Sequence, residues 1–211
     1  MQAGVTRLAE GYPGGMRSRT VRHLVLALAT LAVAAALAAQ AQAGTSTVAK
    51  IYEAFSYHGV VIPHAQSTVS GYCVASSSAA PRIDAWRCVE GTTTLDPCFS
   101  SEFANGVVCA SPWKDTAIVI TLTKPLPRPT SRAAPTLKQH PWAIQLANGA
   151  DCIYAPQNTR VHGHRLTYAC ATAHLALWGL PNRKHRTWTI LSAPTGSTRL
   201  THHASILHAW M

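Results

Sequence analysis

The chain has 211 residues, of which 47% are hydrophobic and 12% charged, and its formal net charge is +10. This length allows one domain or two small ones. Glycine and proline contribute 13 residues each, which excludes a low-complexity or collagen-like chain.

The N-terminal 43 residues have the pattern of a secretory signal peptide preceded by an extension. A basic stretch at residues 17–23 precedes an apolar run from Leu24 to Ala39, and Ala41-Gln42-Ala43 is a small-x-small cleavage site. The apolar run is shorter than the ~20 residues that a membrane-spanning helix needs. We therefore expect a hydrophobic signal helix that is removed after Ala43, with an uncleaved membrane anchor as the alternative. Met16 is the expected first residue, and a longer basic region is the other interpretation.

The charge of the exported part bears on its partners. Residues 44–211 keep 14 Lys and Arg against seven Asp and Glu, a net charge of +7. Basic exported chains can associate with cell-wall or other anionic polymers. The positive charges are scattered apart from one cluster at residues 183–186. Scattered charge is more typical of a soluble surface than of a specific polyanion site. We expect a secreted or cell-wall-associated protein with an anionic polymer as candidate partner. No specific nucleic acid is expected, and membrane contact is expected only through the signal peptide.

All six cysteines follow the cleavage site, at Cys73, Cys88, Cys98, Cys109, Cys152 and Cys170. An even number in an exported chain predicts disulfides. The Pro-rich stretch 124–141 separates four cysteines from two, which predicts Cys152–Cys170. Sequential pairing, Cys73–Cys88 and Cys98–Cys109, is preferred among the first four. A two-residue Asn105-Gly106 turn would instead place Glu102 opposite Cys109, so either that loop is larger or the pairing differs.

Short β-branched and aromatic runs follow from residue 67 onward, separated by Gly, Pro, Asn and Ser, and none has a helical period. We expect an all-β, antiparallel, disulfide-stapled domain over 67–211, sandwich or barrel-like, with a leader or edge segment at 44–66 and a Pro-rich loop at 124–141. A single domain is preferred over two lobes joined by that loop. Asn148-Gly149 predicts a hairpin turn. The expected strands are 84–90, 117–123, 142–147, 151–155, 165–171, 174–178, 186–192 and 200–210.

Several cysteines lie in distinctive short motifs. These are Trp86-Arg87-Cys88, Asp96-Pro97-Cys98-Phe99, Cys109-x-x-Pro112-Trp113 and Pro141-Trp142-x-x-x-Leu146-x-Asn148-Gly149-x-x-Cys152. Together they resemble a group of uncharacterised exported Cys-rich proteins and extracellular modules of high-GC Gram-positive bacteria, over about residues 71–191. The resemblance implies export and fold. It carries no activity and no catalytic residue over to this chain.

Candidate chemistry is sparse. The tryptophans at strand positions predict a core, with a carbohydrate-stacking platform as the alternative. His162, His164, His202, His203 and His208 predict surface histidines, with a copper or zinc site as the alternative. The aspartates beside cysteines or turns can be explained by capping and turn-stabilising roles, without a catalytic one. They are Asp84, Asp96 and Asp151. Cys170 with Arg183 is a faint transpeptidase pattern.

No sequence motif of a hydrolase, metalloprotease or phosphate-binding loop is present. We therefore expect no catalytic residue, cofactor or metal site. The preferred function is a non-enzymatic exported β module of unknown ligand. A secreted hydrolase or transpeptidase is the alternative.

Overall fold

The computed structural model describes residues 46–130, 133–156, 160–161, 164–171, 174–194 and 202–211. The predicted signal helix lies outside these residues. No helix in the described ranges is long and apolar enough to cross a membrane. The described residues belong to one compact unit, Thr45–Met211.

This unit is all-β, as the sequence predicted. Its strands are β1 (Val48–Lys50), β2 (His64–Ser76), β3 (Ala85–Glu90), β4 (Thr93–Ser100), β5 (Gly106–Ala110), β6 (Thr116–Leu122), β7 (Ala143–Leu146), β8 (Asp151–Tyr154), β9 (Arg160–Val161), β10 (His164–Cys170), β11 (Leu175–Asn182), β12 (Trp188–Pro194) and β13 (His202–Trp210).

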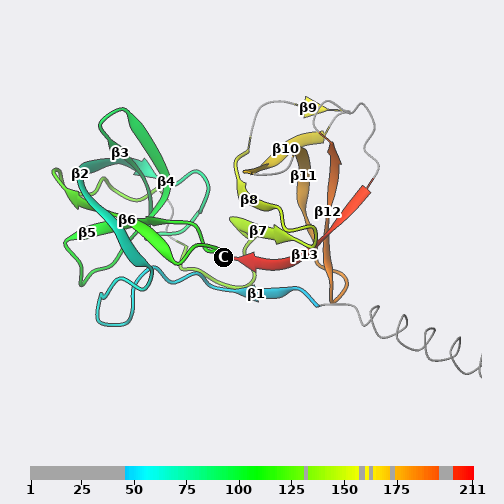
Figure 1. Ribbon diagram of the computed structural model, residues 1–211, viewed down its shortest axis with the longest axis horizontal. Coiled ribbons are helices and arrows are strands. Elements are labelled where there is room, and N and C mark those ends of the chain that lie inside the picture. Colours follow the sequence, from blue (N-terminus) through cyan, green and yellow to red (C-terminus); the bar gives the residue numbers. More distant parts are fainter. Residues whose placement is uncertain (1–45, 131–132, 157–159, 162–163, 172–173, 195–201) are drawn as a thin grey trace, which may run out of the picture. The chain divides into compact units, whose positions relative to one another are not determined.

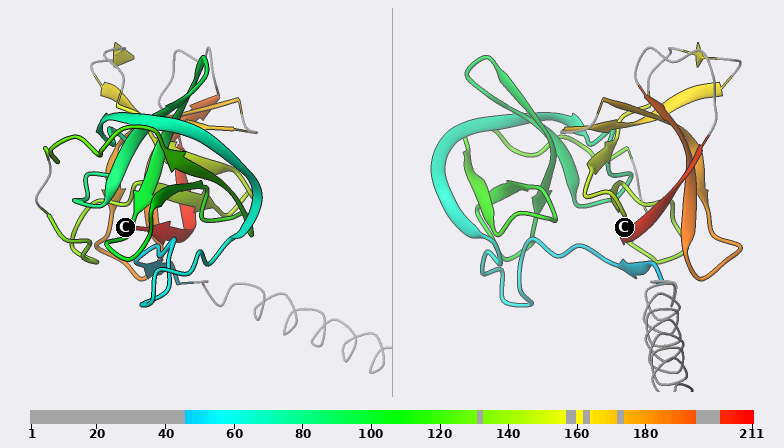
Figure 2. Two further views of the ribbon diagram at one scale, coloured as in Figure 1. Left: turned by 90° about the vertical axis from the view of Figure 1, so that its left-hand side faces the viewer. Right: turned by 45° about the vertical axis from the view of Figure 1, so that its right-hand side comes forward.

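Strands β2 to β6 form a closed barrel in which each strand pairs with the next along the chain (Figure 1). The four sequential pairs are antiparallel, but β2 and β6 close the barrel in parallel. Successive strands of a meander alternate in direction, so the first and the fifth point the same way and can only close in parallel. The expected antiparallel domain is wrong at this closure. Figure 2 shows β2 curving strongly along its length.

A second ring of six strands, β7, β8, β10, β11, β12 and β13, closes where β13 pairs with β7. Six is an even number, so this closure is antiparallel like the other pairs in the ring. The strand β1 adds to β13 in parallel. The segment 44–66, expected to be a leader or edge segment, therefore contributes an edge strand.

Each barrel has its own core, and a third cluster draws on both. All five strands β2–β6 contribute buried side chains to one cluster, and all six strands of the second ring contribute to another. The third contains Phe99 from β4, Trp142 and Trp210 from the β7–β13 region, and Tyr52 from the β1–β2 connection. In the sequence, the Pro-rich segment 124–141 connects β6 of the first barrel to β7 of the second. The two barrels share the buried aromatic contacts of this third cluster.

The structure forms three disulfides, Cys73–Cys88, Cys98–Cys109 and Cys152–Cys170, the same pairs that the sequence favoured. Each joins residues that face each other on neighbouring strands. Between β4 and β5 the loop spans residues 101–105, longer than a two-residue turn, so Cys109 faces Cys98 and not Glu102.

Candidate functional site

The connection between β1 and β2 places an aromatic turn at the surface. Phe55 and Val61 form an antiparallel bridge at the base of the turn. Within it, the Ser56 amide donates to the Val60 carbonyl at 2.8 Å, and the Gly59 amide donates to the Ser56 carbonyl at 2.9 Å. The Val60 amide also donates to Ser56 Oγ at 3.2 Å. These bonds hold Tyr57 at the tip, where it is 85% exposed.

The turn rests on the loop between β4 and β5. Gly59 has a φ of +76°, and a Cβ on it would lie 2.7 Å from Phe103 Cβ and 3.0 Å from the Phe103 carbonyl atoms. Only glycine therefore fits this contact without a shift of backbone. The contact brings the rings of Tyr57 and Phe103 to 6.4 Å between centroids, although Phe103 is itself 61% exposed. Two exposed aromatic rings are thus held beside each other.

Beside these rings lies a groove of about 330 Å³, which we call the aromatic groove. Four aromatic residues, three serines and three carboxylates line it together with Arg82 and Ala54. They are Phe55, Tyr57, Phe99, Phe103, Ser56, Ser100, Ser101, Glu53, Asp84 and Glu102. Apolar rings with a few hydrogen-bonding groups are the usual composition of a ligand site.

Arg82 forms a buried wall of the aromatic groove. Its Nη1 donates to the carbonyls of Tyr52 at 2.8 Å and Met211 at 3.0 Å. Its Nε and Nη2 donate to the two carboxylate oxygens of Asp84 at 2.9 and 2.6 Å. Its guanidinium carbon also lies 5.0 Å from the centre of the Phe99 ring. Arg82 therefore joins the segment after β1, the residue after β13 and the residue before β3.

The charges of the aromatic groove differ from those of the chain. Three of the seven carboxylates of residues 44–211 line it. Asp84 is neutralised by Arg82. Glu53 and Glu102 are exposed, and neither forms an ion pair within the described residues. The groove therefore keeps two carboxylates that have no ion-pair partner among the described residues.

The tryptophans that the sequence singled out are mostly core residues. Trp86, Trp142 and Trp178 are buried, and Trp113 and Trp188 are partly buried. Trp188 lies under the Arg183 guanidinium at 4.4 Å, and Trp86 donates to Ser100 Oγ at 2.8 Å. The described tryptophans therefore do not form an exposed stacking platform.

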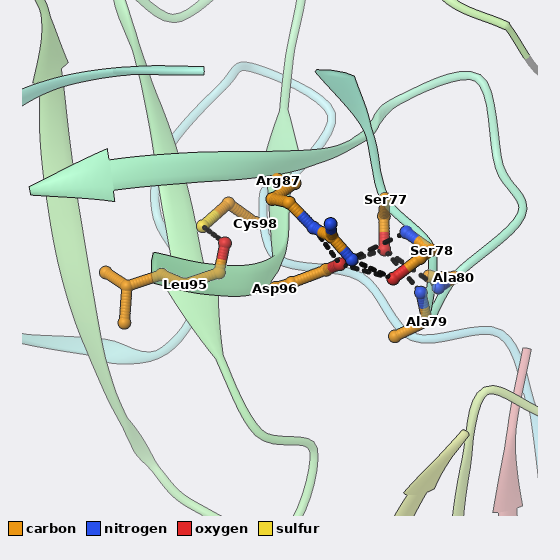
Figure 3. Close-up of polar contacts among 8 residues, drawn as sticks. All are labelled: Ser77, Ser78, Ala79, Ala80, Arg87, Leu95, Asp96 and Cys98. Carbon is orange, nitrogen blue, oxygen red and sulfur yellow. Dashed lines mark hydrogen bonds and ion pairs between the residues drawn. The ribbon is translucent and has the colours of Figure 1, made fainter. Parts of the chain in front are cut away.

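Asp96 is held in a polar network that Figure 3 shows. Its Oδ1 accepts from Ser77 Oγ. Its Oδ2 accepts from the amide and hydroxyl of Ser78 at 3.1 and 2.8 Å and from Arg87 Nε at 3.0 Å. Ser77 Oγ in turn accepts the amides of the two residues after Ser78. Both carboxylate oxygens are occupied, so the network fastens a loop to β4.

The other predicted polar residues lie apart from the aromatic groove. Asp151 accepts from Gln145 Nε2 at 2.9 Å. His202 and His203 are exposed, and the His208 ring packs on Trp210. His162 and the side chain of His164 lie outside the description. Among the described residues no three His, Cys, Asp or Glu are grouped as a metal site would require.

The faint transpeptidase pattern requires Cys170 as a free thiol nucleophile, and the structure does not provide one. Cys170 is bonded to Cys152, and no cysteine of the chain is free. Arg183 donates to the carbonyls of Leu137 at 3.0 Å and of Gln139, so its guanidinium holds the end of the Pro-rich segment.

Sequence reasoning missed Tyr57 and Phe103. Tyr57 lies in the segment interpreted as a leader or edge segment, and Phe103 lies just before the possible Asn105-Gly106 turn. An aromatic residue inside Ser56-Tyr57-His58-Gly59, a polar turn sequence, is the signal that could have found the first. Nothing local predicts that the two meet.

No protein-family model, no curated protein and no solved structure matches the chain.

Proposed function

We propose that this chain is an exported, non-enzymatic β module that binds its ligand at the aromatic groove. The observation that carries the proposal is the pair of exposed rings, Tyr57 and Phe103, at 6.4 Å. Large aromatic side chains contribute much of the binding energy of protein surfaces. Here the turn hydrogen bonds and the Gly59 contact fix the backbone that carries the two rings before any ligand arrives, which lowers part of the entropy cost of binding.

Export is part of the same proposal. Three disulfides are compatible with an extracellular location, and the N-terminal sequence pattern supports secretion. Association with the cell wall would place the module near polymers rich in charged and hydroxyl groups. Scattered positive charges outside the aromatic groove would supply a general attraction to anionic polymers.

The test compares Tyr57→Ala and Phe103→Ala with Val74→Ala. Val74 is also an exposed apolar side chain, but it lies on β2 and does not line the aromatic groove. The purified chain is titrated with cell-wall fractions and soluble wall fragments, and the fragments are then analysed for breakdown products. We expect each aromatic variant to weaken binding by about tenfold or more, with Val74→Ala unchanged and no products formed.

Two results would overturn the proposal. Binding that both aromatic variants leave intact would place the ligand elsewhere. Wall fragments that are cleaved or joined at a rate proportional to the amount of this protein added would make the chain a hydrolase or transferase.

A further inference from the structure

We propose that the aromatic groove recognises a lysine-type ammonium group carried by a peptide. This inference rests on the proposed function and adds the chemistry of the ligand. It starts from Glu53 and Glu102, which line the aromatic groove without an ion-pair partner in the described part of the chain.

The difference in charge between the aromatic groove and the rest of the chain favours a positively charged ligand. Residues 44–211 carry a net charge of +7, yet the only basic side chain in the lining, Arg82, is 5% exposed and bonded to Asp84. No positive charge of the lining is therefore free to meet an anion. An anionic polymer entering the groove would approach two carboxylates without a compensating donor, whereas a cation would pair with them.

The rings select an ammonium group on an apolar stem. A lysine side chain buries its methylene stem along apolar surface while its charged end reaches polar groups. The exposed rings of Tyr57 and Phe103 offer such a surface, and a cation near a ring face gains further attraction. The same kind of contact exists within this chain, where Lys124 Nζ lies 4.0 Å from the centre of the Tyr72 ring.

The hydrogen-bonding groups match the three donors of an ammonium. Each ammonium has three N–H donors and no acceptor, and it needs carboxylate or hydroxyl oxygens around it. Glu53 and Glu102 supply carboxylates, and Ser56 and Ser101 line the same groove with hydroxyls. Hydrogen bonds between charged groups are stronger than neutral ones, so the carboxylates should dominate the affinity.

The experiment uses an end-blocked trilysine peptide and the same peptide with its side-chain amines acetylated. Both are titrated into the full exported chain by calorimetry at about pH 7.5, where the lysine amines of the first peptide are charged. Acetylation removes the charge and keeps the stem. We expect it to weaken binding by about tenfold or more.

Protein variants test which carboxylates act. Glu53→Gln and Glu102→Gln should each weaken trilysine binding by about fivefold. Glu90→Gln removes a carboxylate of β3 that does not line the aromatic groove, and it should stay within about twofold. Equal binding of the charged and acetylated peptides, or binding that neither glutamine variant weakens, would overturn the inference. The ligand comparison needs no variant, so it stands even if one folds poorly.

A third ligand tests whether the ammonium group is carried by a peptide or by a sugar. Glucosamine trimer presents amines on a sugar, and tighter binding of this trimer than of trilysine would refute a peptide carrier. If Tyr57→Ala and Phe103→Ala weaken wall-fragment binding while acetylation has no effect, the proposed function stands and the ammonium inference falls. If trilysine binding survives both alanine variants, the ammonium inference falls, because the peptide then binds outside the aromatic groove. The proposed function falls only if wall-fragment binding survives both variants.

Discussion

Replacing Arg82 by methionine should destabilise the fold more than any loss of a surface ion pair. Arg82 is 5% exposed, and the Asp84 side chain is 28% exposed. Methionine fills much of the volume but leaves the Asp84 carboxylate without its partner and removes donors from two main-chain carbonyls. Breaking a buried pair costs about 3–5 kcal/mol. Because Asp84 keeps part of its hydration and Met211 O still accepts the Tyr52 amide, we expect about 3 kcal/mol.

Urea unfolding followed by tryptophan fluorescence measures this loss. With a slope of about 2 kcal/mol/M, the midpoint of Arg82→Met should fall by about 1.5 M. Arg87→Met is the matched control, since Arg87 also bonds an aspartate but is 43% exposed. Asp96 keeps its bonds to Ser77 and Ser78 in that variant, so the loss should stay below about 1 kcal/mol.

A double variant tests the reason for the effect. Arg82→Met with Asp84→Leu removes both charges, so no carboxylate is left unpaired, and it should be more stable than Arg82→Met alone. Equal midpoints for Arg82→Met and Arg87→Met, or a double variant less stable than the single one, would refute the argument from burial.

Three other predictions concern separate parts of the chain. The Tyr52 hydroxyl is buried with no hydrogen-bond partner among the described residues, so Tyr52→Phe should keep or raise the melting temperature at neutral pH. Burial raises the pKa of Tyr52 to about 12, against a smaller lowering by Arg82. Folding thus favours the neutral phenol, and its contribution is complete below about pH 10 and lost as the pH rises through about 12. Melting curves should show a smaller alkaline loss for Tyr52→Phe, and an equal loss would contradict this. Gly59→Ala should weaken ligand binding as strongly as Phe103→Ala, because the added methyl group displaces Phe103; unchanged binding would show that the contact is dispensable. Replacing Lys184 and Arg186 by glutamine should reduce the salt dependence of binding to an anionic polymer, measured by retention on a polyanion column, and an unchanged elution salt would exclude this cluster.

Local patterns predicted β3, β6 to β8 and β10 to β13, but they gave no expected strand for β2, β4 or β5. The three disulfide pairs were predicted correctly. The alternation around Tyr168 predicted β10, and Asn148-Gly149 predicted the β7–β8 hairpin. The turn there is one residue longer than a two-residue loop, since Leu146 N bonds to Ala150 O and Gly149 adopts a φ of +83°. This length is one that hairpins with a left-handed glycine commonly use.

Three of the features that were not predicted from the sequence are β4, the parallel closure of the first barrel and the aromatic groove. β4 was not predicted because Pro97 lies inside it, and proline is rare in strands since it donates no hydrogen bond. The parallel closure of β2 with β6 follows from the number of strands in the barrel, which no short window reveals. The aromatic groove was not predicted either, because Tyr57 and Phe103 are far apart in the sequence. Their contact depends on the packing of Gly59 against Phe103.

The pairing of β1 with β13 has a consequence for when the proposed binding surface forms. A chain emerges from synthesis with its N-terminal part first, but Val48–Lys50 must wait for His208–Trp210 before it can join a sheet. Contacts so distant in sequence form late. The segment that follows β1 carries Glu53 and Tyr57, and Arg82 cannot bind Met211 until that residue has arrived. Binding at the proposed site should therefore appear only once β13 has docked, and a chain that lacks β13 should not bind there.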